Sequence, residues 1–119
     1  MNFIGFDVEG IGHFKLKESL TIIEETQLEN RIDDILEGKY YELKARAENL
    51  SVKNVKIAEQ IFSQLFIVQM IATLEMLIVE KPFPNPIRNL EGYDTLWKIW
   101  EAYKKKVTPA ESESPNSSD

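Results

Sequence analysis

The strongest constraint on this chain is a long apolar run near its middle, IFSQLFIVQMIATLEMLIV, from Ile61 to Val79. With the residues before it, this run predicts one helix from about Val55 to Val79 that is apolar on most of its circumference. Such a helix must be surrounded by the rest of the domain or by other subunits. A helix of roughly 25 residues spans about 37 Å, which exceeds what a compact monomer of this size needs. The pattern therefore indicates a homo-oligomer.

The same run is about as long as a membrane span. It also contains five polar side chains, those of Ser63, Gln64, Gln69, Thr73 and Glu75. A single carboxylate within a span costs about 2.5–3.5 kcal/mol on an insertion scale. We therefore expect the buried helix of a soluble protein, with no membrane partner.

Length, charge and cysteine content narrow the class of protein further. A chain of 119 residues is sized for one domain with a single core. The net charge of −6 argues against binding nucleic acid, because phosphate contacts need a clustered basic surface. The sequence has no cysteine and its N-terminus does not resemble a signal peptide, so we expect a cytoplasmic protein.

The first residues, 2–17, predict a β-hairpin. Apolar side chains alternate along both arms, with Ile4, Phe6 and Val8 in the first and Phe14 and Leu16 in the second. Between the arms, Gly10 and Gly12 allow the positive φ values that tight hairpin turns require. A two-stranded hairpin is marginal alone, so its apolar face must pack on the helices that follow.

A helical body is predicted over residues 21–106. Its first helix begins after Thr21, where Glu24 completes a capping box, and Gly38 is the expected residue just past its end. A weaker helix covers YYELKARAENL, and Ser51 or Asn54 could cap the long helix after it.

Three prolines, at positions 82, 84 and 86, then force an extended connector. The last helix is YDTLWKIWEAYKKKV. The predicted fold class is mainly α with a short N-terminal β-hairpin (α+β), with three to four helices packed around one long apolar helix. Residues 1–107 form the single folded domain, and residues 108–119, which lack a large apolar side chain, form a disordered acidic tail.

No catalytic constellation is visible in the sequence. Gly10-Ile11-Gly12 is not a dinucleotide fingerprint, because the third glycine is missing and a strand follows instead of a helix. His13 is the sole imidazole, and no spaced carboxylates would complete a metal site with it. We predict no enzyme, cofactor, metal or small-molecule substrate. A geometry that brought His13 against Asp or Glu in a pocket would revive the enzyme hypothesis.

Two groups of side chains are candidates for contact with a partner protein. One is aromatic and comprises Phe83, Tyr93, Trp97, Trp100 and Tyr103. Aromatic residues at helical spacing usually pack in a core, yet tryptophan and tyrosine also dominate binding hot spots. The other is the acidic face around Asp33 and Asp34, which is either simply solvated or a contact for a basic partner.

The order of these signals resembles a known family. A hairpin with FDVEGIGHFKL is followed by LT opening a helix that ends in LEG, then by ATLEMLIVEKPFP in a long apolar helix, then by YDTLWKIWEAYKKK. Residues 3 to 106 in this order resemble the tail assembly chaperones of long-tailed bacteriophages. These are small proteins often built from a strand pair with a G-x-G-x-F turn, a helical body and a terminal aromatic helix.

The resemblance implies a non-enzymatic function. Family members bind the tape measure protein, keep its long hydrophobic helices soluble and help tail tube proteins polymerise around it. They act in the cytoplasm of the host cell and do not remain in the mature virion. An exposed apolar groove would suit this role, and self-association would protect that groove when it is empty.

A second hypothesis belongs to a different class of protein. The chain could instead be a small acidic regulatory or adaptor module that binds a basic protein surface through Asp33 and Asp34. Binding of this kind depends strongly on salt concentration, whereas a chaperone for apolar helices should form oligomers.

Overall fold

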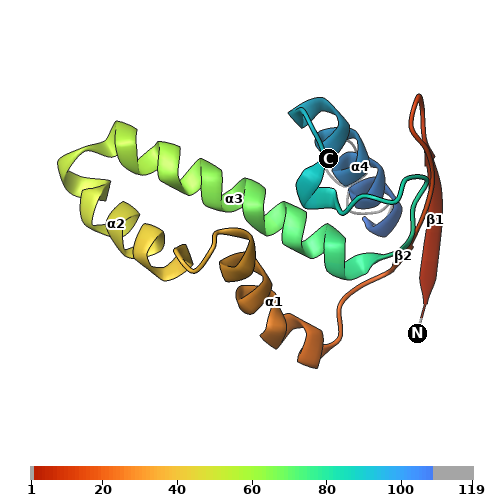
Figure 1. The fold of residues 1–119 in the computed structure, drawn as a ribbon, viewed down its shortest axis with the longest axis horizontal. Coiled ribbons are helices and arrows are strands. Elements are labelled where there is room, and N and C mark those ends of the chain that lie inside the picture. The colour runs from red at the N-terminus through yellow and green to blue at the C-terminus, as the bar shows by residue number, and fades with distance from the viewer. Residues whose placement is uncertain (1, 109–119) are drawn as a thin grey trace, which may run out of the picture. The chain divides into compact units, whose positions relative to one another are not determined.

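In a computed structural model, which describes residues 2–108, the chain is mainly helical with a small antiparallel sheet (Figure 1). The predicted fold class is therefore confirmed. The predicted tail lies outside the described residues apart from Thr108. Contacts divide the chain into two compact units. We call residues 2–19 with 77–108 the hairpin unit and residues 20–76 the helical unit. The single domain over residues 1–107 stays a prediction.

The hairpin unit begins with the predicted hairpin, formed by β1 (Phe3–Val8) and β2 (Gly12–Lys17). The strands pair in antiparallel register, with Phe6 opposite Phe14. The Ile11 N–H donates to the Val8 carbonyl in the turn, where Gly10 has a φ of 81°. The alternating apolar side chains of Phe6, Val8, Phe14 and Leu16 are buried, as the period of two predicts.

A third strand completes the sheet, and the sequence reasoning missed it. The long helix was predicted to reach Val79, but it ends at Leu77 and the chain continues as β3 (Ile78–Glu80). β3 pairs antiparallel with β2, giving the order β1-β2-β3. The pairing partner lies more than sixty positions away in the sequence, so a local periodicity argument cannot find it. The β-branched Ile78 and Val79 suit a strand as well as a helix end.

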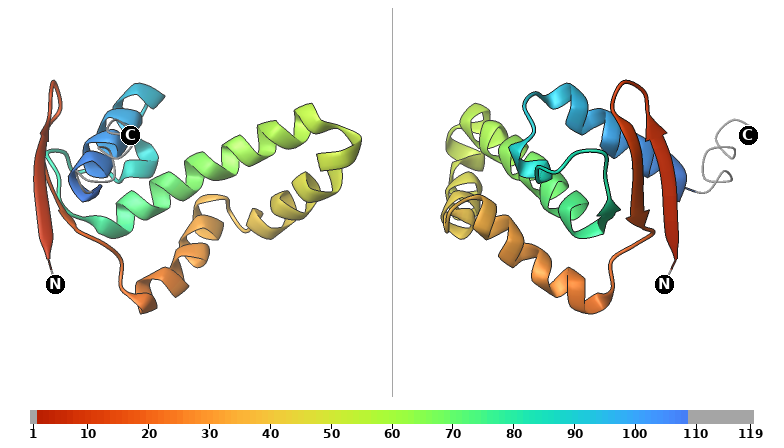
Figure 2. Two further views of the ribbon diagram at one scale, coloured as in Figure 1. Left: turned by 180° about the vertical axis from the view of Figure 1, so that it is seen from behind. Right: turned by 45° about the vertical axis from the view of Figure 1, so that its right-hand side comes forward.

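The rest of the hairpin unit is a short 3₁₀ turn, η1 (Ile87–Asn89), and α4 (Tyr93–Val107). The prolines at 82, 84 and 86 separate β3 from η1, in agreement with the predicted connector. α4 packs against β1, and Figure 2 shows it lying beside the strands in both views. Phe14 holds this core together, because its ring contacts both Phe6 and Phe83 at centroid distances of 5.8 and 5.9 Å.

The helical unit contains α1 (Ile22–Ile35), α2 (Tyr40–Lys53) and most of α3 (Val55–Leu77). The predicted capping box at Thr21 and Glu24 is present at the start of α1. Asn54 begins α3, since its side-chain oxygen accepts from the Ile57 N–H. α2 and α3 run back along each other after the turn at Asn54 (Figure 1).

The end of α1 differs from the prediction by one residue. Gly38 was expected directly after the last cap residue, but Glu37 occupies that left-handed position, with a φ of 57°. The Glu37 N–H donates to the Asp34 carbonyl and the Gly38 N–H to the Asp33 carbonyl. This is a Schellman motif, in which Gly38 is the second residue past the cap. The sequence therefore places a glutamate where a glycine would be free of strain.

The core of the helical unit joins α1 to α3. Ile32, Val68 and Ala72 are buried together, with half-buried apolar side chains from α1 and Tyr40 around them. At the same junction, Arg31 donates to a carboxylate oxygen of Glu75 at 3.1 Å. The Glu75 side chain is only 6% exposed. The carboxylate that argued against a membrane span is thus paired within the unit.

Candidate functional site

The predicted aromatic stripe of α4 is divided between two faces of the helix. Leu96, Ile99 and Tyr103 are buried, at spacings of three and four residues. Tyr93 and Trp97, also four residues apart, are 60% and 39% exposed. The helix therefore presents one aromatic pair to solvent and uses another part of its circumference for the core.

Tyr103 and Trp100 belong mainly to the core side. The Tyr103 hydroxyl donates to the Glu18 carbonyl at 3.1 Å. Burial raises the Tyr103 pKa above its usual value, and the nearby negative charge of Glu18 raises it further. Trp100 is half-buried, with its ring centroid 5.8 Å from that of Tyr103 and the Lys104 ammonium 5.6 Å from its own centroid.

Phe83 also packs inward. It meets the ring of Phe14 edge-on at an interplanar angle of 75°, and the Lys81 ammonium lies 5.6 Å from its centroid. The structure therefore does not expose the five predicted partner-binding residues as one surface. Tyr93 and Trp97 are accessible, whereas Phe83, Trp100 and Tyr103 are half or wholly buried. A binding role for these residues stays a prediction.

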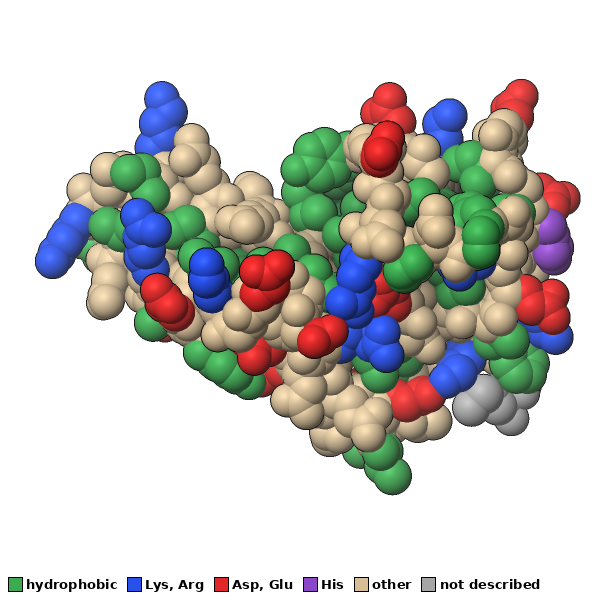
Figure 3. Space-filling view, in the orientation of Figure 1, with side chains coloured by type: hydrophobic (Ala, Val, Ile, Leu, Met, Phe, Trp, Pro, Cys, Tyr) green, Lys and Arg blue, Asp and Glu red, His purple; other side chains and the backbone are tan. Residues whose placement is uncertain are grey.

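A second exposed apolar surface lies on α3, and the sequence reasoning did not single it out. Phe62 and Phe66 are 43% and 50% exposed, and Val55, one heptad before Phe62, is 54% exposed. Their spacing of seven and four residues places them on one face of the helix. Figure 3 shows hydrophobic side chains reaching the surface over several elements. We call Val55, Phe62 and Phe66 the α3 apolar face.

His13 and Asp7 meet across the hairpin. The two residues are directly opposite in the strand register, and His13 Nδ1 lies 2.8 Å from an Asp7 carboxylate oxygen. Both side chains are well exposed, at 61% and 85%. His13 is therefore a surface residue at the start of β2. The pair lies on an exposed strand face, Asp7 also lines the groove between β1 and α4, and the lack of enzymatic activity stays a prediction.

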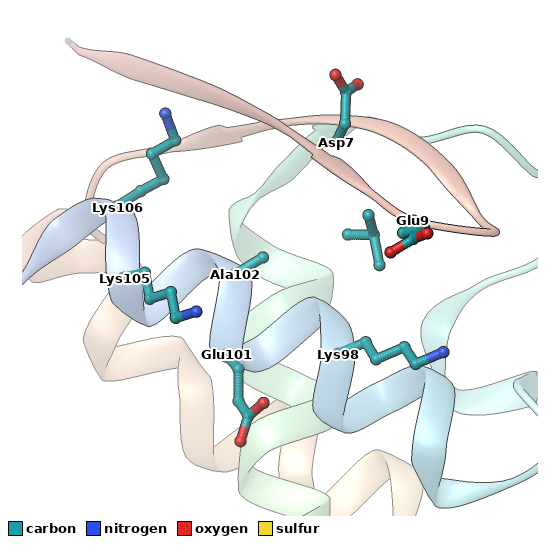
Figure 4. A pocket seen from close by; sticks show the side chains of 8 residues that line it. Asp7, Glu9, Lys98, Glu101, Ala102, Lys105 and Lys106 are labelled. Atoms are coloured by element: carbon teal, nitrogen blue, oxygen red, sulfur yellow. The ribbon is translucent and has the colours of Figure 1, made fainter.

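A groove lies beside β1 in the hairpin unit and was not predicted. It has a volume of about 670 Å³ and is lined by the end of β1 and one face of α4. Figure 4 shows the α4 wall, where Ala102 and Lys106 extend toward the strand while Glu101 points away from it. Asp7 also points away from α4 in this view. The groove is thus bordered by lysines at the end of a helix, a signal that the sequence shows only as the run Lys104 to Lys106.

The acidic residues of α1 have structural partners. Asp33 accepts a hydrogen bond from the Tyr40 N–H at 3.0 Å, at the start of α2. Glu29 accepts from the Tyr41 hydroxyl at 2.8 Å, and this bond raises the Tyr41 pKa. Within residues 2–108, no group of three His, Asp or Glu side chains is placed to hold a metal ion. The acidic face therefore also stabilises the junction between α1 and α2.

α3 is long and apolar enough to cross a membrane by length and composition. Its most apolar window has a mean hydropathy of 1.4, and 33% of that window is buried. Core helices of soluble proteins pass the same test, so the absence of a membrane partner stays a prediction. Comparisons of the chain with protein-family models, with curated proteins and with solved structures found no match.

Proposed function

We propose that this chain is a non-enzymatic tail assembly chaperone, similar to those of long-tailed bacteriophages, that binds apolar helices of a tape measure protein. The order of sequence signals supports this proposal, as do the exposed apolar side chains. In this role the chain keeps its partner soluble and promotes assembly of the tail tube. It acts in the host cytoplasm and leaves before the virion is complete.

The α3 apolar face carries the proposal. A 23-residue helix that leaves Phe62 and Phe66 about half exposed keeps aromatic surface in contact with water. An apolar helix of a partner can cover such a face through side chains at positions i, i+3 and i+4. Large aromatic side chains that a partner buries near the centre of an interface are typical binding hot spots. We therefore assign the main partner contact to this face.

Tyr93 and Trp97 offer a second contact in the hairpin unit. Both are exposed and lie one helical turn apart near the start of α4. Their rings provide amphipathic contact area of the kind that protein interfaces favour. The proposal thus narrows the five predicted aromatic residues to these two.

A genetic test comes first, because it needs no purified partner. If the proposal is correct, the neighbouring reading frames encode a tail tube protein and a very long helical protein. An unrelated neighbourhood would overturn the assignment to phage tail assembly. It would leave open the binding of apolar helices, which the next experiment addresses.

The binding test uses co-expression of the full chain with the long helical neighbour. We expect most of the neighbour to be soluble with the wild-type chain and to precipitate with the double variant Phe62→Ser and Phe66→Ser. The control is Ile22→Ser with Ile23→Ser, which removes two exposed apolar side chains from α1, at 81% and 69% exposure. Equal loss of solubility with both double variants would contradict a specific role for the α3 apolar face.

Self-association is a further expectation of the proposal. Without a partner, the α3 apolar face should be covered by other copies of the chain. Light scattering of the wild-type chain should give the mass of an oligomer, and the double serine variant at Phe62 and Phe66 should shift it toward the monomer. A strict monomer at high concentration would count against this mode of protection.

The acidic-module hypothesis predicts a different result. The helical unit contains ten acidic and six basic residues, so it could attract a basic protein. Asp33 is already bonded to the start of α2, which leaves less of the proposed contact available. A binding affinity that falls steeply from low to high salt would favour the acidic module, because exposed charges are screened within about 10 Å at 0.1 M salt.

A further inference from the structure

β1 is an edge strand, and its register with β2 determines which backbone groups point outward. The Glu18 N–H donates to the Asn2 carbonyl, so even-numbered residues of β1 direct their backbone groups toward β2. In an antiparallel ladder this direction alternates along the strand. The N–H and C=O groups of Phe3, Gly5 and Asp7 therefore point to the outer edge. Within residues 2–108, no other strand pairs with that edge.

The opposite edge of the sheet is protected. β3 has only three residues, its register with β2 is irregular at Lys15 and Leu16, and prolines follow at 82, 84 and 86. Short strands, irregular pairing and proline are the devices by which proteins block an edge. β1 has six residues and lacks proline, lysine and arginine. The sheet thus has one closed edge and one open edge.

The open edge borders the groove described above. Val8 and Glu9 lie on the strand side, and Ala102, Lys105 and Lys106 lie on the α4 side. Within residues 2–108, neither Lys105 nor Lys106 forms an ion pair. Of the three acidic residues that line the groove, Figure 4 shows Asp7 and Glu101 pointing away from it, while Glu9 lies at the turn end of β1. An extended segment added to β1 would thus direct alternate side chains toward lysines.

We propose that the groove between β1 and α4 binds an extended acidic peptide segment, which adds to the sheet as a fourth strand beside β1. The segment carries Asp or Glu at alternate positions, because only alternate side chains of a strand face α4. The outward N–H and C=O groups of β1 supply affinity, and Lys105 and Lys106 supply specificity. This site is separate from the α3 apolar face and does not depend on the proposed chaperone function.

Charge and shape favour an acidic segment over a second copy of β1. Ile4, Phe6 and Val8 form the apolar face of β1, and Val8 lines the groove. A second β1 paired at this edge would place apolar side chains against Lys105 and Lys106 and leave both ammonium groups without a partner. Burying an unpaired charge is costly. Carboxylates at the same positions would pair with them instead.

The first test measures binding of a fluorescent peptide with alternate glutamates to the full chain by anisotropy. We expect saturable binding that weakens about tenfold in the double variant Lys105→Glu and Lys106→Glu. The control is Lys53→Glu with Lys56→Glu, which makes the same charge change on exposed lysines of the helical unit. Equal weakening by both double variants would overturn the site, because it would show general charge attraction.

The second test distinguishes strand addition from other binding in the groove. In an antiparallel fourth strand, the neutral residues donate their N–H groups to β1, while those of the glutamates point away. Methylating the neutral amides should therefore weaken binding about tenfold, and methylating the glutamate amides should not. If the peptide binds as a parallel strand, methylating the glutamate amides should weaken binding and methylating the neutral amides should not. This result would also support strand addition. Equal affinities of the two methylated peptides would overturn it.

The chain's own Glu111 and Glu113 have the same alternate spacing. The measurement is therefore repeated with Glu111→Gln and Glu113→Gln, which removes these side chains as competitors. Unchanged or tighter binding of the peptide supports the proposal. Loss of binding in this variant would contradict it, because the site would then depend on residues outside β1 and α4.

Discussion

The hairpin unit and the helical unit differ in how deeply they bury their aromatic side chains. The hairpin unit buries Phe6, Phe14 and Tyr103 in a core built from segments that are far apart in the sequence. The helical unit leaves both of its phenylalanines, Phe62 and Phe66, about half exposed on α3. Burying a ring stabilises a fold by removing apolar surface from water. The hairpin unit therefore uses some of its aromatic rings to build a core while Tyr93 and Trp97 stay exposed, whereas the helical unit leaves both of its phenylalanine rings partly in water.

The two units also differ in charge. The described part of the hairpin unit has eight basic and seven acidic residues, while the helical unit has an excess of acidic ones. The overall charge of −6 conceals this difference. An acidic peptide would therefore meet less repulsion at the hairpin unit, and the lysines at the end of α4 are concentrated there.

The largest expected effect separates the two kinds of phenylalanine. Phe14→Ala should lower the free energy of unfolding by about 4 kcal/mol, because it empties a fully buried site between two other rings. Phe62→Ala should lower the free energy of unfolding by only about 1 kcal/mol, because nearly half of the residue's surface is already exposed to water. Urea denaturation measures both values. Similar losses in the two variants would contradict the comparison.

The turn of the hairpin gives the next largest effect. Gly12 has a φ of 139°, and a Cβ atom there would lie 2.6 Å from the Cβ of Pro82. Gly12→Ala should lower the free energy of unfolding by about 3 kcal/mol, because backbone strain and this clash act together. Gly10→Ala, where φ is 81° and no atom lies within 4 Å, should cost about 1 kcal/mol. Thermal denaturation of both variants checks the difference, and equal costs would argue against close packing of Pro82 on the turn.

Tyr103 links stability to alkaline pH in the hairpin unit. Its pKa is raised in the folded chain, so its contribution to stability is fully present below the unfolded pKa of about 10 and is lost as pH rises through the folded pKa. Tyr103→Phe should lower the free energy of unfolding by about 1 kcal/mol at neutral pH, because it removes the hydrogen bond to the Glu18 carbonyl. The stability difference between wild type and variant should then narrow as the pH rises above about 10. A constant difference across this range would contradict the role of burial.

The smallest expected effect is a gain in the helical unit. Glu37 adopts a left-handed conformation that favours glycine, so Glu37→Gly should stabilise the chain by about 1 kcal/mol. Glu48→Gly, within α2, should destabilise it by a similar amount, because glycine weakens a helix interior. Opposite shifts in melting temperature are expected. Destabilisation by both variants would indicate that the Glu37 side chain has a compensating role.

Local patterns predicted most of the fold. The alternation in the hairpin, the capping box at Thr21, the long helix and the aromatic last helix all follow from side-chain periods and cap chemistry within one element. The misses have a common cause. β3 depends on hydrogen bonds to a strand at the other end of the chain, and the position of Glu37 depends on which carbonyls the last turn leaves unpaired.

The candidate site was less predictable than the fold. Helical spacing placed Tyr93, Trp97, Trp100 and Tyr103 on one broad stripe, but it could not say which part of that stripe would face β1. Packing decided that Tyr103 is buried against Glu18 and that Trp97 is exposed. The groove depends in the same way on which face of α4 meets the hairpin, so the lysine run alone could not indicate it.

The sequence by itself determined the hairpin and the four helices, the acidic net charge, the lack of cysteine and the presence of one very apolar helix. Each of these depends on residue type or on spacing within one segment. Tertiary structure alone decided which aromatic side chains are exposed, that the sheet has one open and one protected edge, and that lysines border the open one. The physical reason is that exposure and pairing are relations between distant segments, and only the packed chain brings those segments together.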